Sequence, residues 1–301
     1  MSDVAIATDN LTKVYGRRHA VDRLTIEVRA GQVTGFVGPN GAGKTTTIRM
    51  LLGLIRPTSG TAQVLDRRLA DAPSYLHRVG SLVDGPAFYP RLSGRSNLRV
   101  LARLATLDHR VPHVLEVVGL SDRADDPVAT YSLGMRQRLG LAAALLPDPS
   151  LVILDEPANG LDPAGIRDIR RLLRRLADDG ATVFVSSHQL SELQEVSDDV
   201  VLLRKGRLVY QGALAGLIAQ NKARITVRPE DPEHLVVLER IARDNGWSAV
   251  VGQGTLVVGA QSGASGLLNR AAHGQGVTLT ELSSRPPTLE EIFFALTEEE
   301  E

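Results

Sequence analysis

The chain has 301 residues, a formal net charge of −1 and a hydrophobic content of 43%. This length suits one large domain with a smaller one, or two domains, and the balanced charge gives no reason to expect a nucleic-acid binder. Because the chain has no cysteine, disulfides, thiolate metal sites and cysteine nucleophiles are excluded. No apolar run approaches the roughly 18–20 residues that span a bilayer, and the acidic start differs from a secretion signal.

The first half of the chain is expected to combine strands with a long helical stretch. Residues 3–36 alternate apolar and polar positions as half-buried strands do, with a turn at 16–19. The stretch GQVTGFVGPN indicates a buried strand that runs into a glycine loop, and TTIRMLLGLI indicates the helix after it. Residues 70–147 contain one strand pattern, RVGSLVD, and otherwise show helical periodicity.

The second half alternates strands and helices before its character changes. LVILDEP and ATVFVSSH are strand patterns, IRDIRRLLRRLADDG and SELQEVSD are helical ones, and VVLLRKGRLVYQG indicates a hairpin. This alternation predicts an α/β fold with a parallel, helix-covered sheet and a helical insertion. Past residue 220, the order β-α-β-β-α-β with a trailing helix predicts a small ferredoxin-like α+β domain.

A glycine-rich loop provides the strongest chemical motif. GPNGAGKTT matches the pattern G-x-x-x-x-G-K-[ST] between a predicted strand and a predicted helix, which is the context that a phosphate-binding loop requires. Backbone N–H groups of such a loop surround phosphates, Lys44 adds a positive charge, and Thr45 can bind Mg²⁺. The predicted nucleotide-binding residues are Gly38, Pro39, Asn40, Gly41, Ala42, Gly43, Lys44, Thr45 and Thr46.

Two strand ends supply further polar groups. Asp155 ends the apolar strand LVILDEP, where a second Mg²⁺ contact belongs, and Glu156 can orient or deprotonate an attacking water. His188 closes ATVFVSSH and could touch a γ-phosphate. In isolation, the acidic pair could be an ordinary turn and the histidine a structural residue. Together with the loop, these groups leave kinases, GTPases, recombinases and helicases open.

A second helix start has the features of an anion site. In YSLGMRQR, Ser132 occupies an N-cap position, and the free N–H groups and dipole of the following helix favour a negative charge. No lysine lies beside it in the sequence. The origin of the phosphate that this helix would hold is therefore open from the residues alone.

The five segments GPNGAGKTT, YSLGMRQR, LVILDEP, NGLD and SSH, in this order, closely resemble the nucleotide-binding subunit of ABC transporters. The resemblance covers residues 4 to about 220. It implies a P-loop NTPase with a RecA-like core over residues 1–220, a helical subdomain at about 85–150, and an accessory domain over 221–301. It also implies ATP hydrolysis with Mg²⁺, with Glu156 and His188 as catalytic residues and Thr45 and Asp155 as metal ligands.

The resemblance implies partners as well. In this family two ATPase chains, identical or homologous, pair head to tail, so that Ser132 and Gly134 would cap the γ-phosphate held by the partner subunit's loop. The segment Asn159–Asp162 would lie along the dimer seam. Tyr15 would face adenine, and the less favoured alternative is a strand tyrosine packed in the core. A separate membrane permease would hold the pair at the cytoplasmic face of the membrane, with no nucleic acid involved.

Two positions depart from the common family pattern. Leu133 gives S-L-G in place of S-G-G, and Asp84 stands where most members have a glutamine. A carboxylate can bind Mg²⁺ but cannot donate as glutamine does, so Asp84 is predicted as a metal ligand. An acidic residue here resembles bacitracin- and lantibiotic-type exporters, where glutamate is usual. The neighbouring pair Phe88–Tyr89 either packs internally or lines the groove for the permease.

The C-terminal segment RPPTLEEIFFALT resembles the closing motif of daunorubicin- and bacitracin-resistance ATPase subunits. It could also be an ordinary amphipathic helix with Leu289, Ile292, Phe293 and Leu296 on one face. The expected function is the ATPase motor subunit of an export complex for drug- or antibiotic-type cargo. The alternatives are an ABC import ATPase, a soluble ABC ATPase without transport function, and a P-loop kinase.

Overall fold

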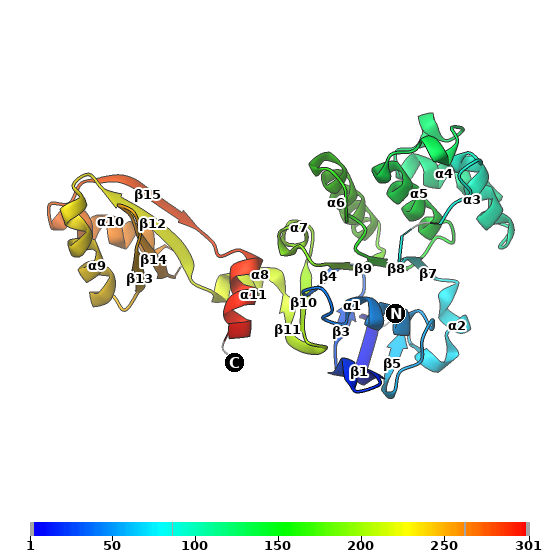
Figure 1. Cartoon of the computed structure of the whole chain (residues 1–301), viewed down its shortest axis with the longest axis horizontal. Coiled ribbons are helices and arrows are strands. Elements are labelled where there is room, and N and C mark those ends of the chain that lie inside the picture. The colour runs from blue at the N-terminus through cyan, green and yellow to red at the C-terminus, as the bar shows by residue number, and fades with distance from the viewer. Residues whose placement is uncertain (1–2, 86, 262, 299–301) are drawn as a thin grey trace. The chain divides into compact units, whose positions relative to one another are not determined.

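The computed structural model describes residues 3–85, 87–261 and 263–298 (Figure 1). The chain divides into two compact units, Met1–Ala213 and Leu214–Glu301. The expected boundary near residue 220 falls at the end of helix α8 (Leu214–Gln220), the first element of the second unit. Within the described residues, every helix is too short or too polar to cross a membrane.

A six-stranded sheet forms the centre of the first unit, in the order β11-β10-β4-β9-β8-β7. Its neighbours from β10 to β7 run parallel, and β11 joins β10 as an antiparallel hairpin. The inner strands are continuous apolar runs because helices cover both faces. The strands are β4 (Val33–Val37), β7 (Val79–Leu82), β8 (Leu151–Asp155), β9 (Thr182–Ser187), β10 (Asp199–Arg204) and β11 (Arg207–Ala213).

Helices α6 (Pro163–Asp178) and α7 (Leu190–Gln194) lie on one side of this sheet, and α1 (Lys44–Leu51) lies on the other (Figure 1). Helix α6 begins where the Asp162 side chain accepts the Gly165 N–H at 2.9 Å, which satisfies one of the free donors at the helix start. Its buried residues repeat at helical spacing, so one face packs on β9 and β4.

A second sheet of the first unit, antiparallel in all its described pairs, packs over α1. Its order is β2-β1-β5-β6, with β3 paired to β1. These strands are β1 (Val4–Tyr15), β2 (Arg18–Leu24), β3 (Glu27–Arg29), β5 (Ser59–Val64) and β6 (Arg67–Arg68). Sequence patterns did not predict β5 and β6, because most of their side chains are exposed and the buried pair Ala62 and Val64 gives too short an alternation to stand out.

The stretch 70–147 is mostly helical apart from β7, which confirms the prediction. Its helices are α2 (Pro73–Leu76), α3 (Gly94–Arg103), α4 (Val111–Val117) and α5 (Leu133–Leu145). Short 3₁₀ turns lie at Leu69–Asp71, Asp108–Arg110, Ser121–Arg123 and Val128–Thr130. Tyr131, just before α5, is buried, and its hydroxyl donates to the Arg123 carbonyl at 2.6 Å. This contact fixes the chain at the start of the helix.

The second unit has the predicted order β-α-β-β-α-β with a trailing helix. Its antiparallel sheet has the order β13-β14-β12-β15, and α9 and α10 pack on it around Ile225, Leu238 and Leu268. The elements after α8 are β12 (Ala223–Pro229), a 3₁₀ turn (Pro232–His234), α9 (Leu235–Asp244), β13 (Ser248–Val251), β14 (Leu256–Ala260), α10 (Ala264–Gly274), β15 (Leu279–Arg285) and α11 (Leu289–Glu298).

Candidate active site

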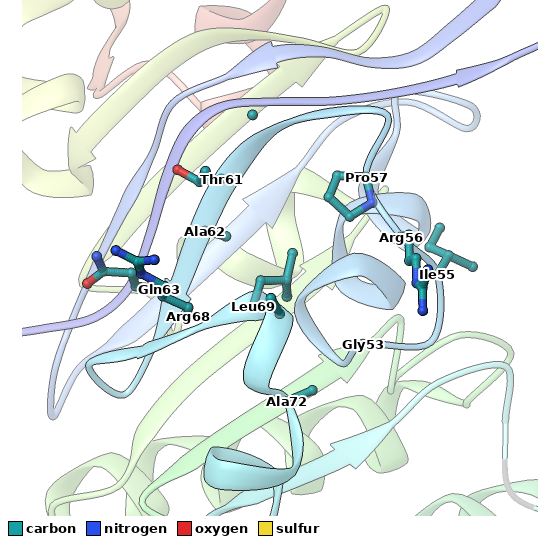
Figure 2. Close-up of a pocket in the computed structure, with 12 residues that line it drawn as sticks. Gly53, Ile55, Arg56, Pro57, Thr61, Ala62, Gln63, Arg68, Leu69 and Ala72 are labelled. Carbon is teal, nitrogen blue, oxygen red and sulfur yellow. The ribbon is translucent and has the colours of Figure 1, made fainter.

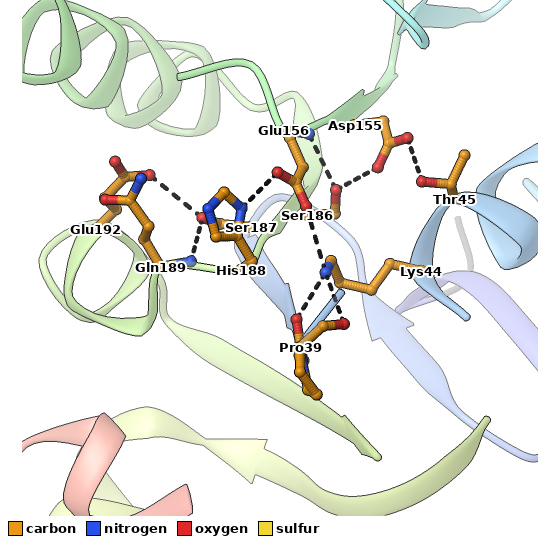
Figure 3. A network of polar contacts seen from close by, with 11 residues as sticks. Pro39, Lys44, Thr45, Asp155, Glu156, Ser186, Ser187, His188, Gln189 and Glu192 are labelled. Carbon is orange, nitrogen blue, oxygen red and sulfur yellow. Dashed lines mark hydrogen bonds and ion pairs between the residues drawn. The ribbon is translucent and has the colours of Figure 1, made fainter. Parts of the chain in front are cut away.

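The order of the central strands gathers the predicted polar groups at one edge of the sheet. Strands β4, β9 and β8 are parallel neighbours, so their carboxyl ends meet at the same edge. The glycine loop follows β4, Asp155 is the last residue of β8, and His188 directly follows β9. Segments that are more than a hundred residues apart in the sequence thereby share one site (Figure 3).

The glycine loop holds Lys44 in a buried position at the start of α1. Gly43 has a φ of 107°, and a Cβ there would lie 2.4 Å from the Ala20 carbonyl oxygen, so only glycine fits. The Lys44 ammonium donates to the Gly38 carbonyl at 2.6 Å and lies 3.3 Å from a Glu156 carboxylate oxygen. With 5% of its side chain exposed, this cation is directed inward, toward the loop and the carboxylates.

The Asp155 carboxylate receives a hydroxyl at each of its oxygens. Thr45 donates to Oδ2 at 2.7 Å, and Ser186 donates to Oδ1 at 2.6 Å (Figure 3). The adjacent threonine hydroxyl and carboxylate are hard oxygen ligands, which suit Mg²⁺. The donor set at this point therefore fits the metal that the sequence predicted, and Ser186 is a polar contact that the sequence analysis did not assign.

Glu156 places its carboxylate between a lysine and a histidine. One oxygen faces Lys44, and the other lies 2.5 Å from Nδ1 of His188. An ionised carboxylate only accepts hydrogen bonds, so this contact requires a hydrogen on Nδ1 of His188. The backbone at Glu156 has a φ of 49°, a left-handed conformation that is rare for this residue type and that turns the chain sharply after β8.

A pocket of about 360 Å³ lies over the glycine loop. Tyr15, Arg18 and Glu156 line it together with most of the loop. The Tyr15 ring is 51% exposed, and the Lys13 ammonium lies 5.2 Å from its centroid, so this tyrosine is not packed in the core. Arg18 is a further lining residue that no sequence pattern singled out. The loop residues in the lining are Asn40, Gly41, Ala42, Gly43, Lys44, Thr45 and Thr46.

Asp84 lies just beyond the end of β7 and pairs with an arginine. Both of its carboxylate oxygens accept from Nη2 of Arg49 on α1, at 2.7 Å each. These hydrogen bonds raise the pKa of Arg49 above its ordinary value. The metal-ligand role of Asp84 stays a prediction, because in this structure its carboxylate is engaged by the guanidinium. Nearby, Phe88 is half-buried and Tyr89 is exposed.

Ser132 and Gly134 lie at the start of α5, and neither lines the pocket over the glycine loop. The Ser132 hydroxyl caps the helix by accepting the Met135 N–H at 3.2 Å. The following residue, Leu133, is 43% exposed and touches the segment Asn159–Asp162, since a Cβ on Gly160 would lie 3.0 Å from its side chain. The structure therefore does not bring this helix start to the Lys44 cluster of the same chain.

A larger hollow of about 890 Å³ opens elsewhere in the first unit, between the end of α1 and the β5–β6 hairpin (Figure 2). Arg56 and Arg68 line it together with mostly apolar residues, among them Ile55, Pro57 and Leu69. None of the predicted site residues lines it. The chemistry that the sequence predicts therefore belongs to the smaller pocket over the glycine loop.

Comparison with known proteins places this geometry in a family. A family model described as "ABC transporter" matches residues 21–159. The bacitracin transport ATP-binding protein BcrA of Bacillus licheniformis is 40% identical over 295 residues, which are 97% of this chain and 96% of that protein. The daunorubicin resistance ATP-binding protein DrrA3 of Streptomyces coeruleorubidus is 34% identical over 307 residues, 99% of this chain and 97% of that one.

A solved structure has the same fold. It is described as the dimeric structure of a post-hydrolysis state of an ATP-binding cassette bound to ADP and Pi. The match has a TM-score of 0.63 and 22% sequence identity, and it covers 69% of this chain and 98% of the cassette chain. The curated relatives extend beyond the cassette through the second unit, and the resemblance inferred from five short segments is thereby confirmed. The chain belongs to the ATP-binding proteins of the ABC transporter family and is an ATPase of the cassette fold.

Proposed function

We propose that this chain is the motor subunit of an ABC export complex for drug- or antibiotic-type cargo. It would pair head to tail with a second ATPase chain and act at the cytoplasmic face of a membrane through a separate permease. Two relatives that match over nearly the full length are a bacitracin transport and a daunorubicin resistance ATP-binding protein, and these functions support this cargo class.

The loop and the first carboxylate would bind the nucleotide and its metal. The loop N–H groups and Lys44 would hold the phosphates, because the ammonium can exchange its loop carbonyls for phosphate oxygens. Thr45 and Asp155, whose oxygens lie 2.7 Å apart, would hold Mg²⁺, which neutralises phosphate charge when bound. Tyr15, exposed at the rim of the pocket, would stack on adenine.

Glu156 would act as the general base. Its carboxylate accepts from His188 and faces Lys44, so it is held at the phosphate end of the pocket and can take a proton from water. When a γ-phosphate draws Lys44 toward itself, the carboxylate loses this ion pair and becomes available to the water. His188 would orient the base and contact the γ-phosphate.

The position of the α5 start is the observation that carries the dimer proposal. Ser132 caps a helix whose N–H groups suit an anion, yet it does not line the pocket of its own chain. A second chain in head-to-tail orientation would bring this helix start to the phosphate held beside the partner's glycine loop. The solved cassette described as a dimer with ADP and Pi has the fold needed for this arrangement.

The solution mass of the Glu156→Gln variant with and without Mg-ATP tests the proposal. Slow hydrolysis should trap the closed pair, so light scattering should give a dimer with ATP and a monomer without it. Adding Ser132→Arg should abolish the shift, because a long side chain at the helix start would block the partner's phosphate.

Two results would count against the proposal. A dimer that survives Ser132→Arg would mean that the α5 start does not cap the second nucleotide. A monomer under all conditions, including after addition of the permease in detergent, would exclude the head-to-tail pair. Transport assays in inverted vesicles with the permease would then separate export from import, because only export accumulates cargo inside such vesicles.

A further inference from the structure

Ser186 is the penultimate residue of β9, follows three apolar residues and is fully buried. Its hydroxyl makes two contacts at once. It donates to Oδ1 of Asp155 at 2.6 Å and accepts the backbone N–H of Glu156 at 3.0 Å (Figure 3). One side chain on β9 therefore joins two consecutive residues at the end of β8.

The first contact orients the Asp155 carboxylate. With Ser186 on one oxygen and Thr45 on the other, the carboxylate plane has a donor at each end and cannot rotate without breaking a short hydrogen bond. Hydrogen bonds to an ionised carboxylate are stronger than neutral ones, and burial strengthens them further. Oδ2 is thereby kept beside the Thr45 hydroxyl, as a magnesium site requires.

The second contact supports the unusual backbone of Glu156. The peptide N–H of this residue donates both to the Ser186 carbonyl, at 3.2 Å, and to the Ser186 hydroxyl, at 3.0 Å. These bonds help to hold the left-handed turn at φ 49°, which an unsupported glutamate would disfavour. This backbone turn directs the Glu156 carboxylate to a position between Lys44 and His188.

We infer that Ser186 is a positioning residue for ATP hydrolysis, whose hydroxyl fixes the metal-binding carboxylate of Asp155 and the backbone of the base Glu156 as one unit. The inference rests on the roles proposed above for these two residues. It assigns to β9 a contribution to the reaction that is separate from His188, two residues further along the chain.

The next residue offers a matched control. Ser187 is also buried, but its hydroxyl contacts Glu192 at 3.3 Å and accepts the Gln189 N–H at 2.9 Å, so it serves the segment after β9 (Figure 3). Ser187→Ala removes the same group from the same strand without touching Asp155. Ser186→Thr keeps a hydroxyl, and Ser186→Ala removes it.

The experiment measures two quantities for the full chain and each variant. One is the Mg²⁺ concentration that gives half-maximal ATP hydrolysis, together with kcat. The other is ADP affinity by calorimetry, with Mg²⁺ and with EDTA. We expect Ser186→Ala to need about tenfold more Mg²⁺, to have a kcat about tenfold lower, and to bind ADP normally in EDTA. Ser186→Thr should recover most of both losses, and Ser187→Ala should need the same Mg²⁺ as the parent chain.

An unchanged Mg²⁺ requirement in Ser186→Ala would overturn the inference, as would an equal change in Ser187→Ala. If Ser186→Ala does not fold, Ser186→Cys, with a similar size and a weak donor, takes its place with the same expected loss. A parent chain that hydrolyses no ATP in Mg²⁺ would instead contradict the roles proposed for Asp155 and Glu156.

Discussion

At the scale of single residues, the central group of the site is one carboxylate, which has a lysine ammonium on one side and a histidine ring nitrogen on the other. Glu156 lies between the buried ammonium of Lys44 and Nδ1 of His188, and its backbone is held by Ser186. A side chain restrained on this many sides is suited to present its oxygens in a fixed direction, as general-base chemistry requires.

Replacing Glu156 by glutamine should separate binding from hydrolysis. An amide keeps the shape and can still contact His188, but it cannot take a proton from water, so phosphate release should fall by ~10²-fold or more. ATP affinity should be retained, because the loop and Lys44 are unchanged. Glu195→Gln, the same change at an exposed carboxylate, is the control. Near-normal phosphate release in the Glu156 variant would remove this residue from its proposed role.

The sequence predicted which residue types meet here, and it failed where a contact depends on the fold. Lys44, Thr45 and Asp155 belong to patterns whose spacing carries their chemistry. Ser186 lies in the segment SSH, but its partners, Asp155 at the end of β8 and Glu156 just after it, are 31 and 30 residues away, and only the strand pairing reveals them. Arg49 was missed for the same reason, since its pairing with Asp84 joins α1 to the end of β7.

At the scale of elements, α11 begins with a reciprocal cap. The Thr288 hydroxyl accepts the Glu291 N–H at 3.2 Å, and the Glu291 carboxylate accepts the Thr288 N–H at 2.9 Å. Arg285 at the end of β15 donates to both oxygens of Glu291. Hydrogen bonds from Arg285 and Thr288 lower the pKa of Glu291 from 4.5 to about 2.

The stability of the second unit should therefore depend on pH in acid. A carboxylate with a depressed pKa in the folded state stabilises the fold above its unfolded pKa, and this stabilisation is lost as the pH falls from 4.5 toward 2. Glu291→Gln should lower the thermal midpoint at pH 7, and the gap from the parent should close as the pH drops through this window. Glu290→Gln, one residue earlier and exposed, is the control. If the difference in thermal midpoint between the parent chain and Glu291→Gln does not change with pH, the ionised Glu291 carboxylate is not the source of the stabilisation.

Elements were predicted best where periodicity is strong. The buried runs of β4, β8 and β9 and the amphipathic α6 follow directly from the sequence. Strand β5 was missed because its exposed residues leave little apolar pattern, and it is held by pairing with β1. At its start, Gly60 lies so close to the Asn10 carbonyl that a Cβ would sit 2.2 Å away, a constraint that only the paired strands impose.

At the scale of the whole molecule, each unit has its own core. One lies among the sheets and α1 of the first unit, and the other lies between the antiparallel sheet, α9 and α10 of the second. The order of the elements was predictable in the second unit and, apart from strands such as β5 and β6, in the first, and a change in sequence character near residue 220 predicted a boundary that lies at the end of α8. The pairing of strands across long stretches of sequence was not predictable, because it depends on contacts rather than on local pattern.

Two separate cores should unfold as two calorimetric transitions, each sensitive to its own substitution. On β7, a Cβ at Gly80 would lie 2.2 Å from the Ala144 carbonyl oxygen, so Gly80→Ala should cost ~1–3 kcal/mol and lower only the transition of the first unit. Glu291→Gln should lower only the transition temperature of the second unit. A scan in which both substitutions shift the same transition would mean that the units unfold together.

The contact between Gly160 and Leu133 has a consequence for the proposed pair. Gly160 lies four residues after Glu156, and Leu133 lies at the beginning of the helix that the proposed pair would offer to the other chain, so the segment after the base of one site lies against the helix start proposed to cap the other. In such a pair, a nucleotide state that shifts this backbone would also change the nucleotide affinity of the other site, and the reverse effect would be equal in size. The two ATP molecules would thus bind cooperatively, and a side chain at residue 160, which would press on Leu133, would change this coupling.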